Sequence, residues 1–138
     1  MADTLKLEIV TPETTIYSED VEMVTLPGSE GEAGIYPNHV PLMTQVQAGE
    51  IIVNRGGTEE AIAIGEGFAE ITGDHIAILT DNAANSADID EAAAEEAKAK
   101  AEQRLEEGGD VSGEEAKALT QAILYSQAQI KAKHRKRG

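Results

Sequence analysis

The chain has 138 residues, of which 41% are hydrophobic, and a formal net charge of −15 at pH 7. This length fits one domain, or one small domain with an appendage, and the apolar fraction is sufficient for a core. Because there is no cysteine, disulfides, cysteine-ligated zinc, iron–sulfur clusters and thiol nucleophiles are excluded. One Phe, three Tyr and no Trp leave few aromatic faces for binding sugars or nucleic-acid bases.

The charge is distributed unevenly along the chain. Residues 1–85 contain 2 basic and 15 acidic side chains, whereas residues 86–138 contain 9 basic and 11 acidic ones. The acidic part repels nucleic acid, so we expect basic or polar protein partners. We find neither the pattern of a secretory signal nor a run of about 18 apolar residues, so we expect membrane contact only through a partner.

The first part of the chain predicts β-strands. Leu5, Leu7 and Ile9 alternate with polar residues, and the same period of two places Val21, Met23 and Thr25 on one face. Four further apolar runs, EIIVN, EAIAIG, GFAEIT and HIAILT, follow, with the turn residues RGGT and GD between neighbouring runs. Short strands at this spacing predict an antiparallel sandwich or a flattened barrel.

The second part predicts two helices. The stretch SADIDEAAAEEAKAKAEQRLEE contains no Gly or Pro and is rich in strong helix formers. Asp88 with Glu91 predicts its N-terminal cap, and the Gly-Gly pair that follows it predicts its end. A second capping box, Ser112 with Glu115, predicts a helix that continues to about Lys133.

We therefore expect two domains, a β-sandwich at residues 1–85 and a helical hairpin at residues 86–138. The apolar face of the hairpin is expected to consist of Ile89, Ala93, Ala97, Ala101 and Leu105 in the first helix and Leu119, Ala122, Ile123, Leu124 and Ile130 in the second. A buried methyl group contributes about 0.8 kcal/mol, against about 1.5 to 3 kcal/mol for a Leu or Ile side chain. An alanine-rich hairpin should therefore dock weakly and be able to leave; a permanently packed helical cap is the alternative.

The stretch GSEGEAGIYPNHVPL, residues 28–42, predicts a glycine-rich acidic loop. It has no Lys after its glycines and no following helix, so it is not a phosphate-binding loop. Ser29, His39 and Asp74 could be combined into a hydrolase triad, but nothing around Ser29 resembles a strained strand-to-helix elbow. The three histidines are too far apart in sequence for a shared metal site. We expect neither catalysis nor a metal, and the loop is either a contact surface or a solvated connection.

Five of the basic residues gather at the end of the chain: Lys131, Lys133, Arg135, Lys136 and Arg137. Such a run is often a solubilising tail. Here it continues the second predicted helix, where cations suit the helix dipole and can bind an acidic partner. Both interpretations are open from the residues alone.

The chain resembles the epsilon subunit family of bacterial F-type ATP synthases, from LKLEIVTPE through GSEGEAGIYPNHVPLMTQVQAGEI and GEGFAEITGDHIAILTDNA to the hairpin. The resemblance implies an α+β, mainly β fold, with a ten-stranded antiparallel β-sandwich followed by a two-helix antiparallel hairpin. It also implies a non-catalytic subunit of the central stalk that couples the gamma subunit to the c-ring during rotation. The residues that it implies for contact with the c-ring and gamma are Glu30, Gly31, Glu32, Tyr36 and His39.

The same resemblance implies that the two helices can extend along gamma into the catalytic head and inhibit ATP hydrolysis. The basic end of the chain would then contact the beta and alpha subunits, and the complex would hold the chain at the cytoplasmic face of the bacterial cell membrane. Two alternatives are a free-standing sandwich that dimerises through its hairpin and a metal-dependent β-barrel enzyme. Co-purification with a large membrane complex distinguishes the first alternative, and bound metal distinguishes the second.

Some members of this family bind ATP in the folded hairpin through Ile or Leu, Asp, two variable residues, Arg and Ala. The corresponding positions here are Ile89, Asp90, Ala93 and Ala94, so Ala93 stands where the arginine would be. Because that cation is missing, we expect regulatory ATP binding to be weak or absent. The resemblance implies no other cofactor.

Overall fold

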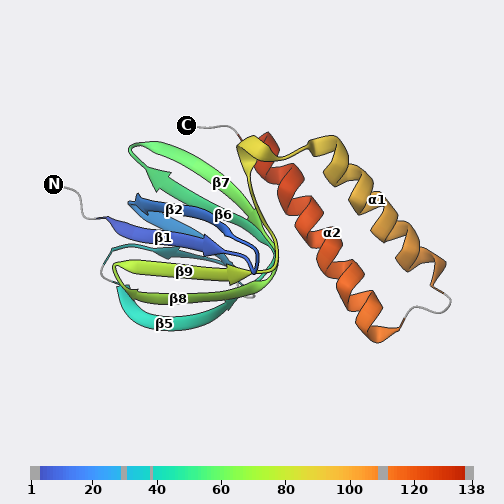
Figure 1. Ribbon diagram of the computed structural model, residues 1–138, viewed down its shortest axis with the longest axis horizontal. Helices are drawn as coiled ribbons and strands as arrows, with labels where there is room; N and C mark the ends of the chain where they lie inside the picture. Colours follow the sequence, from blue (N-terminus) through green and yellow to red (C-terminus); the bar gives the residue numbers. More distant parts are fainter. Residues whose placement is uncertain (1–3, 29–30, 38, 109–111, 136–138) are drawn as a thin grey trace.

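The computed structural model describes residues 4–28, 31–37, 39–108 and 112–135. Within these residues two five-stranded sheets form a sandwich, and two helices pack beside it (Figure 1). The strands are β1 (Leu5–Val10), β2 (Thr15–Val21), β3 (Met23–Gly28), β4 (Gly31–Ile35), β5 (His39–Val46), β6 (Gly49–Arg55), β7 (Thr58–Ile64), β8 (Gly67–Gly73), β9 (His75–Thr80) and β10 (Ala83–Asn85). A 3₁₀ turn, η1 (Ser86–Asp88), leads to the helices α1 (Glu91–Glu107) and α2 (Gly113–His134).

Sheet A has the strand order β2-β1-β9-β8-β5, and sheet B has the order β10-β7-β6-β3-β4. Neighbouring strands are antiparallel, as predicted, except that β1 runs parallel to β9. Each of these two strands also forms an antiparallel hairpin, β1 with β2 and β9 with β8. The parallel pair is therefore the seam where the first hairpin of the chain meets a late one.

The core between the sheets is built by alternate residues, as the period of two predicts. Leu5, Leu7 and Ile9 of β1 are fully buried, and Ile76 and Ile78 of β9 face the same way. The register pairs Leu7 with Ile76 and Ile9 with Ile78, which places these side chains in rows across the two strands. The sandwich has a continuous aliphatic core without aromatic bulk beyond Tyr17.

The alternation predicted for Val21, Met23 and Thr25 is wrong. Val21 and Val24 are fully buried, while Met23 and Thr25 are only partly buried. The cause is that β2 belongs to sheet A and β3 to sheet B, so the chain changes sheets at Glu22. The crossing therefore changes which alternate residues of the chain face the core.

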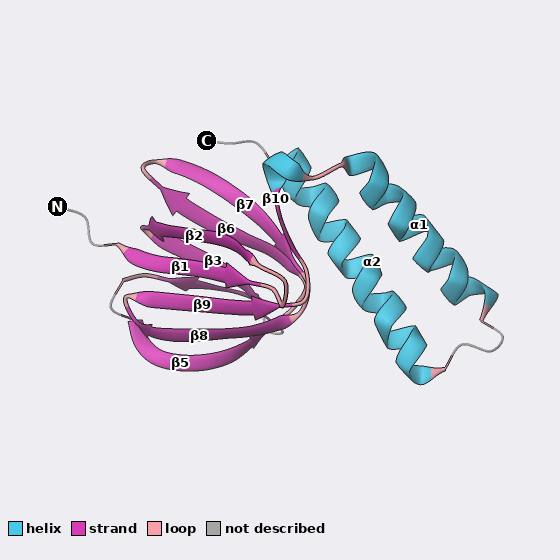
Figure 2. Cartoon of the chain, viewed as in Figure 1, coloured by secondary structure: helices cyan, strands magenta, loops and turns pink. Residues whose placement is uncertain are grey.

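The hairpin lies against one side of the sandwich, and Figure 2 shows α2 between α1 and the strands. α2 packs on β6 and β7, while α1 packs on α2. The helix ends only partly match the predicted caps. Asp90 begins α1, and its carboxylate accepts a hydrogen bond from the Ala93 amide at 3.2 Å, whereas Asp88 lies in η1. The three residues of η1 form a 3₁₀ turn, and the helical pattern of the sequence could not distinguish them from the first residues of α1.

The other two predicted helix ends are confirmed. Gly108 follows α1 with a φ of 58°, a left-handed conformation that glycine adopts without strain. The Ser112 hydroxyl accepts a hydrogen bond from the Glu115 amide at 3.1 Å and caps α2.

The predicted apolar face of the hairpin is only partly correct. Ile89 is buried as predicted, although it lies before α1 rather than in it, and Leu105 is partly buried. In α1, Ala101 is buried as predicted, but Ala93 and Ala97 are exposed and Ala94 is buried. In α2 the buried residues are Ser126, Ala128 and Ala132, while the larger predicted side chains Leu119, Ile123 and Ile130 are partly buried and Ala122 and Leu124 are exposed. The sheet surface beneath α2 is built largely of alanine, so small helix residues make the closest approach.

Candidate functional site

The segment that contains the predicted contact residues is mostly strand, and the predicted loop is therefore wrong over much of residues 28–42. β4 is the edge strand of sheet B and β5 is the edge strand of sheet A, and a short connection joins these two edges. Gly28 pairs with Gly31, so β3 and β4 form a tight hairpin. Glycine and proline suggested a loop, but edge strands tolerate both residues.

The predicted contact residues are spread along this edge of the sandwich. Gly31 and Glu32 belong to β4, and His39 begins β5 opposite Gly73. Tyr36 lies in the connection and is 61% exposed. The five residues of β4 extend the chain by roughly 16 Å, so Gly31 and Tyr36 lie at opposite ends of the strand. Glu30 lies outside the described residues.

A row of apolar side chains crosses the outer face of sheet A beside this edge. Val10 of β1 pairs with Leu79 of β9, and Leu79 pairs with Phe68 of β8. Phe68 is 53% exposed and Leu79 is 50% exposed, and Met43 of β5 is exposed as well. The single Phe of the chain therefore faces solvent rather than the core.

The row borders a depression of about 440 Å³ at the end of the sheet. Its lining consists of Val10, Thr11, Pro12, Gln45, Glu66, Gly67, Phe68, Leu79, Thr80 and Asp81. Gly67 is required here because a Cβ atom would overlap the backbone carbonyl of Leu79. The depression is open and mostly apolar, and its lining includes the acidic residues Glu66 and Asp81, which suits another protein surface.

Sequence reasoning missed this apolar row, although a signal was present. Val10, Phe68 and Leu79 each fall out of phase with the buried residues of their own strand. An apolar residue at an outward position is unremarkable alone. These three residues indicate a contact surface only because the register brings them together across neighbouring strands.

A second surface joins α2 to the outer face of sheet B. A buried cluster of small and aliphatic side chains forms the contact: Ile52, Ala61, Ala63, Ile89, Ala128 and Ala132, with Ala84 and Tyr125 packed at its border. Burial raises the pKa of the Tyr125 hydroxyl. The alanine-rich docking predicted from sequence is present, but its residues in α2 are Ala128 and Ala132 rather than the larger side chains.

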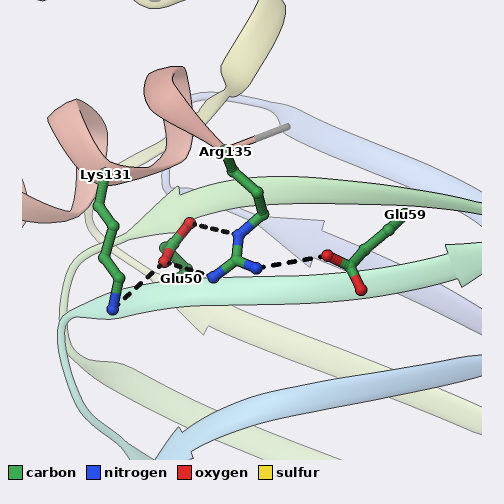
Figure 3. A network of polar contacts seen from close by, with 4 residues as sticks. All are labelled: Glu50, Glu59, Lys131 and Arg135. Carbon is green, nitrogen blue, oxygen red and sulfur yellow. Dashed lines mark hydrogen bonds and ion pairs between the residues drawn. The ribbon is translucent and has the colours of Figure 1, made fainter. Parts of the chain in front are cut away.

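A network of ion pairs joins the C-terminal end of α2 to sheet B (Figure 3). Arg135 donates to both carboxylate oxygens of Glu50, from Nε and Nη2, at 3.1 Å each. Its Nη1 lies 3.3 Å from Glu59, and Lys131 Nζ lies 3.7 Å from Glu50. These hydrogen bonds to Glu50, followed by the negative charges of Glu50 and Glu59, raise the pKa of Arg135. Two of the five predicted basic residues thus bind the sandwich of their own chain.

Of the other three basic residues at the end of the chain, Lys133 alone belongs to the described residues. Lys133 Nζ lies 3.5 Å from the backbone carbonyl of Ser86, and Lys136 and Arg137 lie outside the described residues. Within the hairpin, Arg104 donates to Glu115 at 2.9 Å and bridges the two helices. This hydrogen bond and the charge of Glu115 raise the pKa of Arg104.

The degenerate ATP-motif positions serve the fold in this structure. Ile89 is buried in the contact between hairpin and sheet, and Asp90 caps α1. Ala93 is exposed, and Ala94 is buried. No cationic side chain occupies the position that the motif gives to arginine.

No group of three or more His, Asp or Glu side chains in the described ranges is arranged to hold a metal ion. None of the helices described is long and apolar enough to cross a membrane.

Residues 4–86 match the family described as ATP synthase, Delta/Epsilon chain, beta-sandwich domain. The chain belongs to this family. It is 41% identical over 109 residues to the ATP synthase epsilon chain of Desulforamulus reducens, an alignment that covers 79% of this chain and 83% of that relative. It is also 45% identical over 71 residues to the epsilon chain of Syntrophobacter fumaroxidans, which covers 51% of this chain and 53% of the relative.

Chains in two solved assemblies have a similar fold. A chain of the Euglena gracilis mitochondrial ATP synthase, solved as OSCP/F1/c-ring in rotational state 1, superposes with a TM-score of 0.75 at 22% identity, covering 95% of this chain and 82% of that one. A chain of the Tetrahymena thermophila mitochondrial ATP synthase central stalk and c-ring superposes with a TM-score of 0.58 at 11% identity, covering 92% and 97%. Both likenesses extend over the sandwich and the hairpin.

Proposed function

We propose that this chain is a non-catalytic subunit of the central stalk of a bacterial F-type ATP synthase. Family membership and the epsilon-chain relatives support this assignment. The observation that carries it is the exposed apolar row on sheet A, because monomeric proteins seldom leave such side chains together in water. A partner that covers Phe68 and Leu79 in the assembled enzyme accounts for their exposure.

Two partners are proposed for two regions of the sandwich. The apolar row and its depression on sheet A bind the gamma subunit, as a shallow apolar surface binds a folded protein domain. The adjoining edge, with Glu30, Gly31, Glu32, Tyr36 and His39, contacts the c-ring and gamma. The c-ring in turn holds the complex at the cytoplasmic face of the cell membrane.

The hairpin regulates hydrolysis by leaving the sandwich. α2 has 22 residues and spans roughly 33 Å, enough to reach from the stalk towards a separate layer of the complex. In the extended form, the basic residues Lys131, Lys133, Arg135, Lys136 and Arg137 bind acidic segments of the beta and alpha subunits and block hydrolysis. The small side chains beneath α2 support this proposal because their burial contributes little per residue.

The regulatory proposal is tested by ATP hydrolysis in an isolated synthase head assembled with the full chain or with a chain ending at Ile89. Ending at Ile89 retains the side chain that covers Ile52 and its alanine neighbours on sheet B. We expect the shortened chain to raise the hydrolysis rate because the inhibitory helices are absent. Equal rates, with both versions bound to gamma, would refute inhibition by the hairpin.

A finer comparison tests the role of the basic end. A chain ending at Ile130 lacks all five basic residues but keeps most of α2. If their charge attracts the beta subunits, this chain inhibits less than the full chain, and the difference shrinks as salt concentration rises. Equal inhibition by both versions would assign inhibition to the helices alone.

Regulatory ATP binding is tested by calorimetry with the isolated chain. We expect no measurable binding of ATP, because Ala93 supplies no cation for a phosphate group. The matched variant Ala93→Arg restores the motif at an exposed position of α1 and should bind more tightly than the parent. Tight binding by the unmodified chain would show that other residues hold the nucleotide.

A further inference from the structure

Glu50 is an acidic residue in an unusual place. It lies on β6 next to Ile51, whose side chain faces the core between the sheets, so Glu50 faces outwards, like Ile52. Its side chain is nevertheless only 6% exposed. The end of α2 lies over this part of sheet B, so the hairpin itself accounts for the burial of this carboxylate (Figure 3).

Arg135 compensates the buried carboxylate with a geometry suited to that task. Nε and Nη2 bind the two oxygens of Glu50 in parallel, which is the arrangement that matches a guanidinium group to a carboxylate. The Arg135 amide also donates to the Ala132 carbonyl at the end of α2. The same residue therefore ends the helix and ties it to β6, while Lys131 adds a more distant positive charge.

We propose that Glu50 and Arg135 form a latch that holds the hairpin in its folded position. When the hairpin is docked, Glu50 is buried and needs the guanidinium group. When the hairpin leaves, Glu50 is hydrated on an open sheet face and Arg135 is released. Loss of Arg135 therefore disfavours the docked form more than loss of one partner of an exposed ion pair would, because only the docked form would then bury an uncompensated charge.

The latch also links docking of the hairpin to inhibition of hydrolysis. This consequence rests on the proposed function. Arg135 and Lys131 belong to the basic end that is proposed to bind the beta and alpha subunits. In the docked form Glu50 of the sandwich pairs with both cations, and Glu59 also pairs with Arg135. The sandwich and the catalytic head therefore compete for the same side chains, and a chain that lacks Glu50 favours the inhibitory form.

Hydrogen exchange of the full isolated chain measures the latch directly. Arg135→Gln leaves Glu50 buried without its bidentate partner, so the amides around Ala128 and Ala132 should exchange about tenfold faster, while amides of β1 and β9 stay unchanged. Lys131→Gln should change the rate less than about twofold because Lys131 is 75% exposed and more distant. Unchanged exchange of α2 in Arg135→Gln would overturn the proposal.

Arg55→Gln is the matched control. Arg55 also binds two carboxylates, Glu19 at 3.0 Å and Glu60 at 3.3 Å, but all three belong to the sandwich. The same chemical change there should leave the exchange of α2 unaltered. Acceleration of α2 in this control equal to that in Arg135→Gln would attribute the effect to general charge loss and contradict the latch.

A double variant gives a result that simple destabilisation does not. Glu50→Gln in the Arg135→Gln background removes the uncompensated buried charge, so exchange of α2 should become slower than in Arg135→Gln alone. Helical circular dichroism should stay constant, which distinguishes undocking from unfolding of the hairpin. Exchange that is as fast as in the single variant, or faster, would refute coupling between the two residues.

The hydrolysis assay separates this inference from the proposed function. If α2 exchanges faster in Arg135→Gln but truncation at Ile89 does not change hydrolysis, the latch stands and inhibition by the hairpin fails. If truncation raises hydrolysis but Arg135→Gln leaves exchange unchanged, inhibition stands and the latch fails.

Discussion

Tyr17 is the one aromatic side chain in the core between the sheets, and its surroundings favour the neutral phenol. Burial, followed by the negative charge of Glu60, raises its pKa to about 12. The hydroxyl donates to Glu60 at 3.5 Å, and Arg55 lies close enough to both to oppose part of the shift. Burial, together with the acidic neighbour, thus keeps the hydroxyl at the core border uncharged to a higher pH than in a free tyrosine.

Tyr17→Phe should remove a component of the pH dependence of stability. The unfolded phenol ionises near pH 10 and the folded one near 12, so above pH 10 the unfolded state loses its proton first. The contribution of Tyr17 is therefore fully present below pH 10 and is lost as pH rises towards 12. Urea unfolding of both proteins at pH 7 and pH 11 should show the parent losing more stability. An equal loss in both would contradict the raised pKa.

Gly67 is a second residue whose identity is set by its neighbours. Gly67→Ala should destabilise the sandwich by roughly 2 kcal/mol or more, because the new methyl group must displace the Leu79 backbone in the next strand. Gly113→Ala is a suitable control, since an added Cβ there meets no atom within 4 Å. Urea unfolding should show no loss of stability in the control; similar values for the two variants would exclude the clash.

At the scale of elements, the two helices begin in different ways. α2 follows its serine cap directly, whereas α1 is separated from β10 by η1 and begins only at Asp90. Ile89, which follows η1, packs against sheet B, and the chain then enters α1. The linker between sandwich and hairpin is therefore itself docked.

Asp90→Ala and Asp88→Ala distinguish the observed cap from the predicted one. Loss of the Asp90 cap should cost about 1 kcal/mol in the stability of α1, because the Ala93 amide loses its acceptor. Asp88→Ala should have little effect, since Asp88 lies in η1. Amide exchange in the first turn of α1 measures both variants. A larger effect from Asp88 would restore the cap predicted from sequence.

At the scale of the whole molecule, the sandwich has two outer faces with different coverage. The hairpin covers sheet B over an alanine-rich contact, while sheet A exposes the row of Val10, Phe68 and Leu79. The covered face belongs to the proposed switch and the bare face to the proposed attachment. This separation lets the hairpin move without disturbing the surface that holds the subunit in the stalk.

Phe68→Ser with Leu79→Ser should separate attachment from folding. Both side chains are about half exposed, so the fold should lose little stability, whereas affinity for the gamma subunit should fall at least about tenfold. Calorimetric titration with isolated gamma measures the affinity. Leu124→Ser is the control, because Leu124 is also exposed but lies on α2. Undiminished binding by the double variant would place gamma on another surface.

The sequence alone determined the classes of structure and much of their order. Period-two alternation in β1 and helix-forming composition after residue 85 depend on local residues, and so do the Ser112 cap and the glycine after α1. The family resemblance also followed from the sequence. Local chemistry is sufficient for such features because each is set by residues a few positions apart.

Only the tertiary structure decided which side chains meet. The crossing at Glu22 shifted the buried face, and strand register assembled the apolar row from Val10, Phe68 and Leu79. The pairing of Glu50 with Arg135 joins residues 85 positions apart and has no local signature. From the sequence alone, the basic end of the chain is interpreted as a possible partner surface. Some of its residues instead form ion pairs with the chain's own sheet, because charge pairing depends on distance in space rather than along the sequence.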